Sequence, residues 1–430
     1  MLLLGGALGA VAQPYTLTPL AGVAGDDDVF WADGPAGEAR FYYPHGVALD
    51  PAGNVWVADT WNNVVRQITR TGDGWVVSTP VGSLAGEAGC ADGTDNEASF
   101  FRPMGITVDA AGVVYVTDAG NNTVRQIVSS GTNWVVTTLA GSDQGSGAQD
   151  GPGSEARFNL PRGIAVDAAT NLYVADAANQ TVRKLTPAGS QWMVSTIAGQ
   201  PGISGTNDGA GQTARFYFPL GIAVDGASRV LVADAYNNTL RQLAPTGSNW
   251  VVSTIAGMAG VPGSRDGTNR DARFYYPSGL ALDGTGALYV ADTQNHTFRK
   301  LVLEGTNWVT TTIAGLAGAS GAARGVGPAA RFLFPVGLAA TSEGDIFVAD
   351  TKNNLIRRGQ PTPALGLTRP PGGLVLSWPL WAQHFQLEMT ADLAAPLWTP
   401  LTNGVTVSGE FFVWTGGALA APGFYRLHGP

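Results

Sequence analysis

The sequence predicts an all-β protein, namely a six-bladed β-propeller with four-stranded blades followed by a small β-sandwich. A Pro-x-Gly motif recurs in steps of 59, 58, 58, 58 and 58 residues, at Pro44, Pro103, Pro161, Pro219, Pro277 and Pro335. Each period holds four short runs rich in Val, Ile, Leu and aromatic residues, bounded by Gly, Asn and Asp, which is a strand pattern. A fixed period above about 40 residues with such content is typical of propellers and solenoids, and six four-stranded sheets arranged radially form a propeller.

The fourth repeat shows the four expected strands, Leu220–Asp225, Arg229–Ala233, Thr239–Leu243 and Trp250–Ile255. The third repeat contains Pro-Arg-Gly-Ile-Ala-Val-Asp from Pro161 and Leu-Tyr-Val-Ala-Asp-Ala-Ala-Asn-Gln-Thr-Val-Arg-Lys ending at Lys184. These residues resemble the NHL repeat, and the likeness runs in phase from about Tyr15 to Arg358. The resemblance implies the NHL propeller fold, which elsewhere serves mostly as a binding platform.

The N-terminal segment is predicted to close the ring. Tyr15–Gly22 aligns with Trp250–Gly257, so it has the pattern of a fourth strand without the preceding three. The sixth repeat has three strand patterns and no fourth before Pro361. Because an open ring would leave an unpaired edge strand, we expect the N-terminal strand to complete the sixth blade and to bury Tyr15, Leu17 and Leu20.

Two other recurring features have structural explanations. An aromatic residue opens each fourth strand and is expected to pack between blades; these residues are Trp75, Trp134, Trp192, Trp250, Trp308 and, in the sixth blade, Tyr15. Asp-Gly pairs in the loops between blades suggest tight turns. An Arg follows seven residues later in four copies, at Arg40, Arg157, Arg215 and Arg273, and we expect it to pair with that Asp.

All six repeats carry Asp-x-x-Asn, with Arg seven residues after the Asp. The copies are Asp59/Asn62/Arg66, Asp118/Asn121/Arg125, Asp176/Asn179/Arg183, Asp234/Asn237/Arg241, Asp292/Asn295/Arg299 and Asp350/Asn353/Arg357. A single active site does not need six copies. Asp and Asn at this spacing suit a turn in which their side chains bond backbone amides, so we assign them to the turn between the second and third strands.

The positions that vary between repeats are the candidates for function. In the NHL-like topology, the residue inside Pro-x-Gly and the residues between Asp and Asn face the mouth of the central channel. They mix aromatic rings with hydrogen-bond donors, as a binding surface does. The candidate ligand-binding residues are His45, Trp61, Met104, Arg162, Tyr236, Gln294 and Lys352; the alternative is unconstrained drift at these positions.

Composition and the chain ends restrict the partners. The net charge is −9, with 24 Lys and Arg against 33 Asp and Glu, so nucleic acid and anionic membranes are poor partners. One cysteine, Cys90, excludes an internal disulfide. Residues 1–12 resemble a secretory signal, with an apolar run ending in Ala10-Val-Ala12, and no other stretch is long and apolar enough to span a bilayer. We therefore expect a secreted, periplasmic or cell-surface protein.

Three segments follow the signal in the predicted organisation: a propeller at residues 13–358, a proline-rich linker at 359–371 and a β-sandwich at 372–430. The last segment alternates apolar and polar residues, as in Leu374–Trp378 and Phe385–Met389. It resembles the fibronectin-III-like modules at the C-termini of exported bacterial proteins.

Two functions fit these sequence features. The first is a non-catalytic binding or scaffolding protein that recognises a protein or glycan with the face around the channel and needs no cofactor. The alternative is a calcium-dependent enzyme similar to propeller lactonases or lyases. A zinc site needs about three convergent ligands, yet among the four histidines only His45 lies on the predicted rim. Calcium needs only oxygen ligands, and Asp26-Asp27-Asp28 is the one acidic run.

Overall fold

The chain forms two compact units, which we describe separately. The computed structural model describes residues 13–25, 31–72, 74–363, 365–368, 370, 373–379, 385–392, 396–408, 411–417 and 424–428. The first unit is Pro14–Gln360, and the second contains the described residues from Pro361 onward together with Gln13. The proposed signal at residues 1–12 and the acidic run at Asp26–Asp28 lie outside the described residues.

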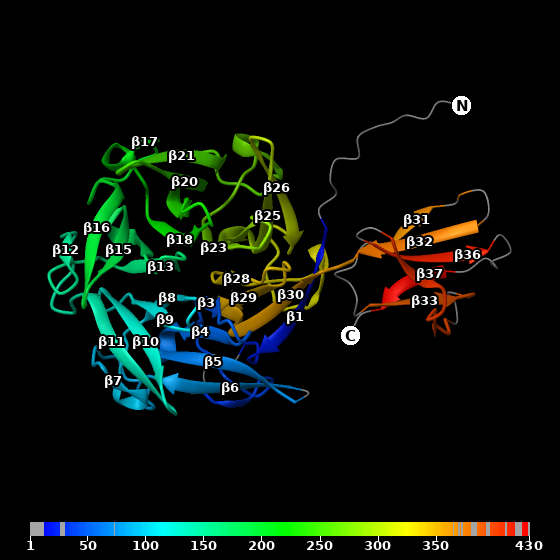
Figure 1. The fold of residues 1–430 in the computed structure, drawn as a ribbon, viewed down its shortest axis with the longest axis horizontal. Coiled ribbons are helices and arrows are strands. Elements are labelled where there is room, and N and C mark those ends of the chain that lie inside the picture. Colours follow the sequence, from blue (N-terminus) through cyan, green and yellow to red (C-terminus); the bar gives the residue numbers. More distant parts are fainter. Residues whose placement is uncertain are drawn as a thin grey trace. The chain divides into compact units, whose positions relative to one another are not determined.

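The first unit is a ring of six antiparallel sheets around a central axis (Figure 1). From the axis outward, blade one consists of β3 (Val47–Leu49), β4 (Val55–Asp59), β5 (Val64–Thr71), β6 (Gly74–Val81) and β2 (Gly34–Pro35). Blade two consists of β8 (Pro103–Val108), β9 (Val114–Asp118), β10 (Thr123–Ser130), β11 (Asn133–Gly141) and β7 (Gly93–Thr94). Blade three consists of β13 (Pro161–Val166), β14 (Leu172–Asp176), β15 (Thr181–Ala188), β16 (Gln191–Gly199) and β12 (Gly151–Pro152).

The other three blades repeat this order. Blade four consists of β18 (Pro219–Val224), β19 (Val230–Asp234), β20 (Thr239–Thr246), β21 (Asn249–Gly257) and β17 (Gly209–Ala210). Blade five consists of β23 (Pro277–Leu282), β24 (Leu288–Asp292), β25 (Thr297–Glu304), β26 (Asn307–Ala314) and β22 (Gly267–Thr268). Blade six consists of β28 (Leu338–Ala340), β29 (Ile346–Asp350), β30 (Leu355–Pro361), β1 (Tyr15–Ala21) and β27 (Gly325–Val326).

Short 3₁₀ turns connect some of these strands. Five of them follow the second strand of a blade, and they are η1 (Thr60–Asn62), η3 (Ala177–Asn179), η5 (Ala235–Asn237), η7 (Thr293–Asn295) and η9 (Thr351–Asn353). Four follow the outermost strand of a blade, and they are η2 (Asp95–Glu97), η4 (Gly211–Thr213), η6 (Asn269–Asp271) and η8 (Gly327–Ala329).

The six-bladed propeller predicted from the repeat is confirmed, with one addition. Each sheet has a fifth, two-residue strand at its outer edge. In blade four it is β17, where Gly209 pairs with Val252 of β21. This strand begins at the Gly of the Asp-Gly pair, so the pair leads into a strand where the sequence suggested a tight turn. Two residues, one of them Gly, carry no strand pattern, and the sequence therefore predicted four strands per blade.

The N-terminal strand closes the ring as predicted. β1 lies between β30 and β27 in the sixth blade, blue beside orange in Figure 1. Tyr15 and Leu17 are buried and Leu20 is half-buried. Tyr15 and Leu17 belong to an apolar cluster that blade six shares with blade five. Leu20 and Ala21 belong to the apolar cluster that it shares with blade one. One strand from the start of the chain therefore packs blade six against both of its neighbours.

The Pro-x-Gly glycine is required where the inner strands meet. A Cβ on Gly221 would lie 1.8 Å from the carbonyl oxygen of Ser278 in the next blade. A Cβ on Gly337 would lie 1.8 Å from the carbonyl oxygen of His45 in blade one. The same relation joins each blade to the next, at 1.8–2.3 Å. These distances are far inside van der Waals contact, so only glycine permits this approach of adjacent backbones.

The outer aromatic residues pack between blades, as predicted. The ring centroids of Trp192 and Tyr115 of the preceding blade are 6.1 Å apart, and those of Trp250 and Tyr173 are 6.0 Å apart, both edge to face. In the sixth blade, the ring centroids of Tyr15 and Tyr289 are 6.0 Å apart, and the hydroxyl groups of these two residues are joined by a hydrogen bond of 2.8 Å.

The second unit contains two sheets that share one apolar core. One sheet has the order β31 (Gly366–Thr368), β32 (Gly373–Pro379), β36 (Phe411–Gly417), β35 (Val405–Ser408), and the other has β34 (Thr399–Pro400), β33 (Gln386–Thr390), β37 (Phe424–His428). Leu376 and Trp378 of the first sheet and Leu387 of the second are buried together. The unit is a small β-sandwich, and its likeness to fibronectin-III modules stays a prediction.

Candidate functional site

The Asp-x-x-Asn turn is a buried structural unit in every blade. In blade four, Asp234 Oδ2 accepts hydrogen bonds from Asn237 Nδ2 and Arg241 Nη1, both at 2.8 Å. Its Oδ1 accepts from the backbone N–H of Tyr217 at 2.7 Å. Burial raises the pKa of Asp234 to about 6 while Arg241 opposes the shift, so the carboxylate is ionised at neutral pH. The structural role assigned to this motif is confirmed.

The loop Asp pairs with a different Arg from the one predicted. Asp208 Oδ1 accepts from Nη2 of Arg241 in β20 at 2.7 Å. Arg215, seven residues after Asp208, instead donates to the backbone carbonyls of Gln212 and Ala214. The predicted pairing was wrong because the guanidinium of Arg241, buried over the ring of Phe216 at 5.1 Å, reaches both carboxylates at once.

Each turn also holds the rim of the next blade. Asn238, in a left-handed conformation after η5, accepts through Oδ1 from the backbone N–H of Tyr276 at 2.9 Å. Tyr276 itself has a φ of 55° and precedes the Pro-x-Gly of blade five. The corresponding pairs are Asn354–Tyr43, Asn63–Arg102, Asn122–Leu160, Gln180–Phe218 and His296–Phe334. The two residues before each Pro-x-Gly are therefore fixed on the face that carries the turns.

Aromatic side chains gather on this face at two places. In the first, which we call the Trp61 cluster, Trp61 lies 5.9 and 5.8 Å from the rings of Tyr42 and Tyr43, and the guanidinium of Arg102 lies 4.7 Å over it. Trp61 is nonetheless 46% exposed. A large aromatic ring held in place and half open to water is suited to binding a ligand.

The second group, which we call the Tyr236 cluster, consists of Tyr217, Phe218, Tyr236 and Tyr276. Tyr236 stacks on Tyr217 at 4.8 Å and contacts Phe218 and Tyr276 edge to face at 5.3 and 5.2 Å. Tyr236 and Tyr217 are 49% and 44% exposed. Three rings from two blades are thus assembled around Tyr236.

The central channel opens between these clusters. Three residues from each blade, beginning at the residue inside Pro-x-Gly, line a cavity of about 100 Å³, among them His45, Met104 and Arg162. His45 Nδ1 lies 3.0 Å from the carbonyl oxygen of Tyr43, and the guanidinium of Arg162 lies 5.8 Å from the centre of the Phe218 ring. One residue of the channel lining therefore contacts each cluster: His45 contacts the backbone of Tyr43, and Arg162 contacts the ring of Phe218.

The remaining predicted residues lie on the same rim. The backbone N–H of Gln294 donates to the carbonyl of Tyr275 at 3.1 Å, and Lys352 Nζ lies 4.3 Å over the ring of Phe334. The residue that directly follows the Asp of each Asp-x-x-Asn motif is buried and does not face the rim. Thr60, for example, donates a hydrogen bond to the backbone carbonyl of Pro103 at 2.7 Å. The structure thus places three of the predicted residues in the channel lining, namely His45, Met104 and Arg162, and the other four in the turns after the second strands, namely Trp61, Tyr236, Gln294 and Lys352. Their role in binding stays a prediction.

The aromatic residues that precede Pro-x-Gly were not among the predicted site residues. Tyr42, Tyr43, Tyr217, Phe218 and Tyr276 supply most of the aromatic surface of the two clusters. Their fixed position before each Pro-x-Gly was visible in the repeat, but their contacts with the turn residues arise from tertiary packing.

A pH-dependent stability is expected from His45. Burial and the nearby Arg162 lower its pKa to about 4, whereas an unfolded histidine titrates near about 6.5. Between these values the unfolded chain binds a proton that the folded chain does not, so acidification favours unfolding. On going from about pH 7 to about pH 4.5, wild type should lose about 2 kcal/mol more stability than the His45→Met variant, which introduces the residue found at Met104. Urea unfolding at both pH values measures this, and equal losses would contradict it.

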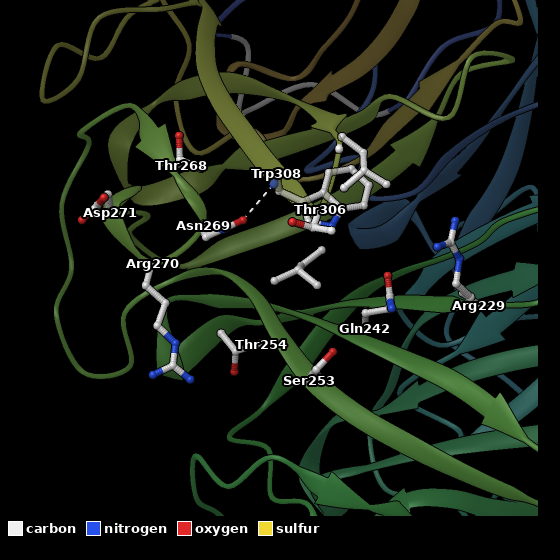
Figure 2. Close-up of a pocket in the computed structure, with 13 residues that line it drawn as sticks. Arg229, Gln242, Ser253, Thr254, Thr268, Asn269, Arg270, Asp271, Thr306 and Trp308 are labelled. Atoms are coloured by element: carbon white, nitrogen blue, oxygen red, sulfur yellow. Dashed lines mark hydrogen bonds between the residues drawn. The ribbon is translucent and has the colours of Figure 1, made fainter.

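A larger groove lies between the outer strands of blades four and five. Its volume is about 730 Å³, and Figure 2 shows Arg229 and Arg270 at opposite sides of it and the bond from Trp308 N to Asn269 Oδ1, which is 2.8 Å long. A groove at the equivalent place between blades two and three is lined by Gln126 and Trp192, the counterparts of Gln242 and Trp308. Because the groove recurs with the repeat, we attribute it to blade packing.

No group of three or more His, Cys, Asp or Glu side chains in the described parts of the chain could hold a metal ion. His296 occupies the turn position of Asn238 and accepts from Phe334 N, as expected for a turn residue. Asp26–Asp28 and His384 lie outside the described residues. Within the described residues, no helix is long and apolar enough to cross a membrane.

Comparison with known proteins agrees with this architecture. The NHL repeat model matches residues 41–68, 274–301 and 332–358. The chain is 28% identical to SUPPRESSOR OF QUENCHING 1 of Arabidopsis thaliana over 73% of its length, and 28% identical to human NHL repeat-containing protein 2 over 63%. These matches span 30% and 40% of the two relatives.

Solved structures share the fold at low sequence identity. A Bacteroides thetaiotaomicron protein of unknown function superposes with a TM-score of 0.59 at 19% identity, covering 80% of this chain and 75% of that one. A Bacteroides ovatus protein described as an auxiliary nutrient binding protein superposes with a TM-score of 0.58 at 14% identity, covering 81% and 77%. The chain thus contains NHL repeats, and its six repeats form a closed β-propeller.

Proposed function

We propose that the protein is an exported, non-catalytic binding platform that recognises a glycan with the face around the propeller channel. The observation that carries this proposal is the pair of half-exposed aromatic clusters around Trp61 and Tyr236. The export is supported by the apolar run Leu2–Ala10 and the small residues that end it; fractionation of expressing cells tests it.

The geometry favours a ligand that uses flat apolar surfaces and hydrogen bonds together. Exposed tyrosine and tryptophan rings offer an apolar face with a polar edge, and sugar rings present C–H groups on their faces and hydroxyls on their edges. The rings do not adapt freely, because the turn of one blade fixes the aromatic residues of the next; Tyr276 is held in this way by Asn238. A preorganised surface loses less conformational entropy on binding.

Arrangement on a repeat scaffold also supports binding. The buried Asp, Asn and Arg side chains are the same in all six blades, whereas the rim residues differ from blade to blade. Function on such scaffolds is carried by variable loops at one end of a rigid framework. Two Bacteroides propellers of this fold are described as auxiliary nutrient binding proteins, a role compatible with the proposal.

The rim variants Trp61→Ala and Tyr236→Ala are expected to weaken glycan binding about tenfold or more, since hot-spot aromatic residues contribute about 2 kcal/mol or more. Binding of the full chain to a glycan array identifies ligands, and calorimetry with a positive glycan measures the loss. The control Val302→Ala removes an exposed apolar side chain from β25, outside the rim. Equal affinity of all three variants and wild type would contradict the proposal.

A further inference from the structure

Among the described residues that line the channel cavity, Arg162 is the only one with a permanent charge, and none is acidic. The fully buried arginines of the propeller each pair with a buried carboxylate, as Arg241 does with Asp234. Arg162 is half-buried and, unlike them, has no ion pair among the described residues; its buried Nε has no hydrogen-bond partner, which is also true of the six paired arginines. A desolvated guanidinium that lacks an anion is costly unless a ligand supplies one.

The surroundings of Arg162 leave its positive charge uncompensated. Its charge interactions are with Tyr236, Tyr276 and Arg102, and none of these is a carboxylate. His45, which also lines the channel, is neutral at physiological pH, because its pKa is lowered to about 4, and it can donate or accept a hydrogen bond. The channel mouth is thus a local positive site in a chain of net charge −9.

The channel has room for an anionic group beside Arg162. The cavity volume is about 100 Å³, and about 10–15 Å³ on this measure already holds one water molecule. A carboxylate therefore fits. The ring of Phe218, which packs against Tyr236, lies 5.8 Å from the guanidinium, so a sugar ring resting on the Tyr236 cluster can extend a substituent towards Arg162.

We infer that Arg162 forms an anion subsite that binds the carboxylate of an acidic saccharide whose ring lies on the Tyr236 cluster. The guanidinium donates two parallel hydrogen bonds to the two carboxylate oxygens, the geometry in which arginine binds carboxylates. This inference rests on the proposed glycan-binding function and names the class of glycan.

The experiment compares a galacturonic acid trisaccharide with the galactose trisaccharide of the same linkage, which differs only in lacking the carboxylates. Calorimetry with the full chain should show that wild type binds the acidic trisaccharide at least tenfold more tightly. Arg162→Gln should remove most of that preference, since a hydrogen bond to a charged group contributes about 1.5–3 kcal/mol, and should leave the affinity for the neutral trisaccharide unchanged. Arg162→Lys keeps the charge without the planar fork and should be intermediate.

The matched control is Arg229→Gln, which removes one positive charge from an exposed arginine in the outer groove. It should leave both affinities at the wild-type values. If wild type binds both trisaccharides equally, or if Arg162→Gln and Arg229→Gln have the same effect, the anion subsite is refuted while the glycan platform stands. If wild type binds neither these nor any arrayed glycan, both proposals are refuted. The wild-type comparison gives its answer even if Arg162→Gln fails to fold.

Discussion

Replacing Gly221 by alanine is expected to destabilise the propeller severely, with little soluble protein or a large fall in melting temperature. The added Cβ would lie 1.8 Å from the carbonyl oxygen of Ser278 and 3.0 Å from the backbone nitrogen of Leu280. Both obstacles are backbone atoms of a paired strand, so no side-chain rotation relieves the clash. Overpacking of ordinary cores costs about 1–3 kcal/mol, and we expect about 3 kcal/mol or more here.

The control for this prediction is Gly226→Ala in the same blade. A Cβ added to Gly226 would meet no atom within 4 Å, and the residue has no positive φ, so this substitution should leave the melting temperature near that of wild type. Thermal unfolding followed by circular dichroism distinguishes the variants. A Gly221→Ala protein that melts together with Gly226→Ala would show that the inner strands are not packed as described.

Deletion of residues 14–22 is expected to yield insoluble or early-melting protein. The deletion removes β1 from between β30 and β27 in the sixth sheet, which exposes the edges of both strands. It also removes the buried side chains of Tyr15 and Leu17, whose burial contributes about 3–6 kcal/mol. That amount is comparable to the net stability of a domain, about 5–15 kcal/mol. Soluble yield and the unfolding curve measure the effect.

Point variants in the same strand separate packing from strand pairing. Leu17→Ala should cost about 2–5 kcal/mol, as large-to-small substitutions in cores do. Thr18→Ala changes an exposed neighbour and should cost little. An unchanged melting curve for the deletion, or equal effects of the two point variants, would show that the ring closes without this strand.

Part of the candidate site followed from comparing the six repeats. The motif of Asp234, Asn237 and Arg241 is present in all six, which identified it as structural, whereas varying positions such as Trp61 and Arg162 pointed to the rim. That Arg162 lacks an ion pair among the described residues could not be predicted, because it depends on the side chains of all six inner strands that meet at the axis.

The repeat period, the strand pattern and the N-terminal segment were sufficient to predict six blades and their closure, because each blade must satisfy the same packing environment and an edge strand must find a partner. Only the folded ring showed three further features. They are the fifth strand of each blade, the ion pair of Asp208 with Arg241, and the hydrogen bond from Tyr276 N to Asn238 Oδ1. Each of these contacts joins residues at least 33 positions apart, so they form once strands and blades are brought together, and no local pattern in the chain encodes them.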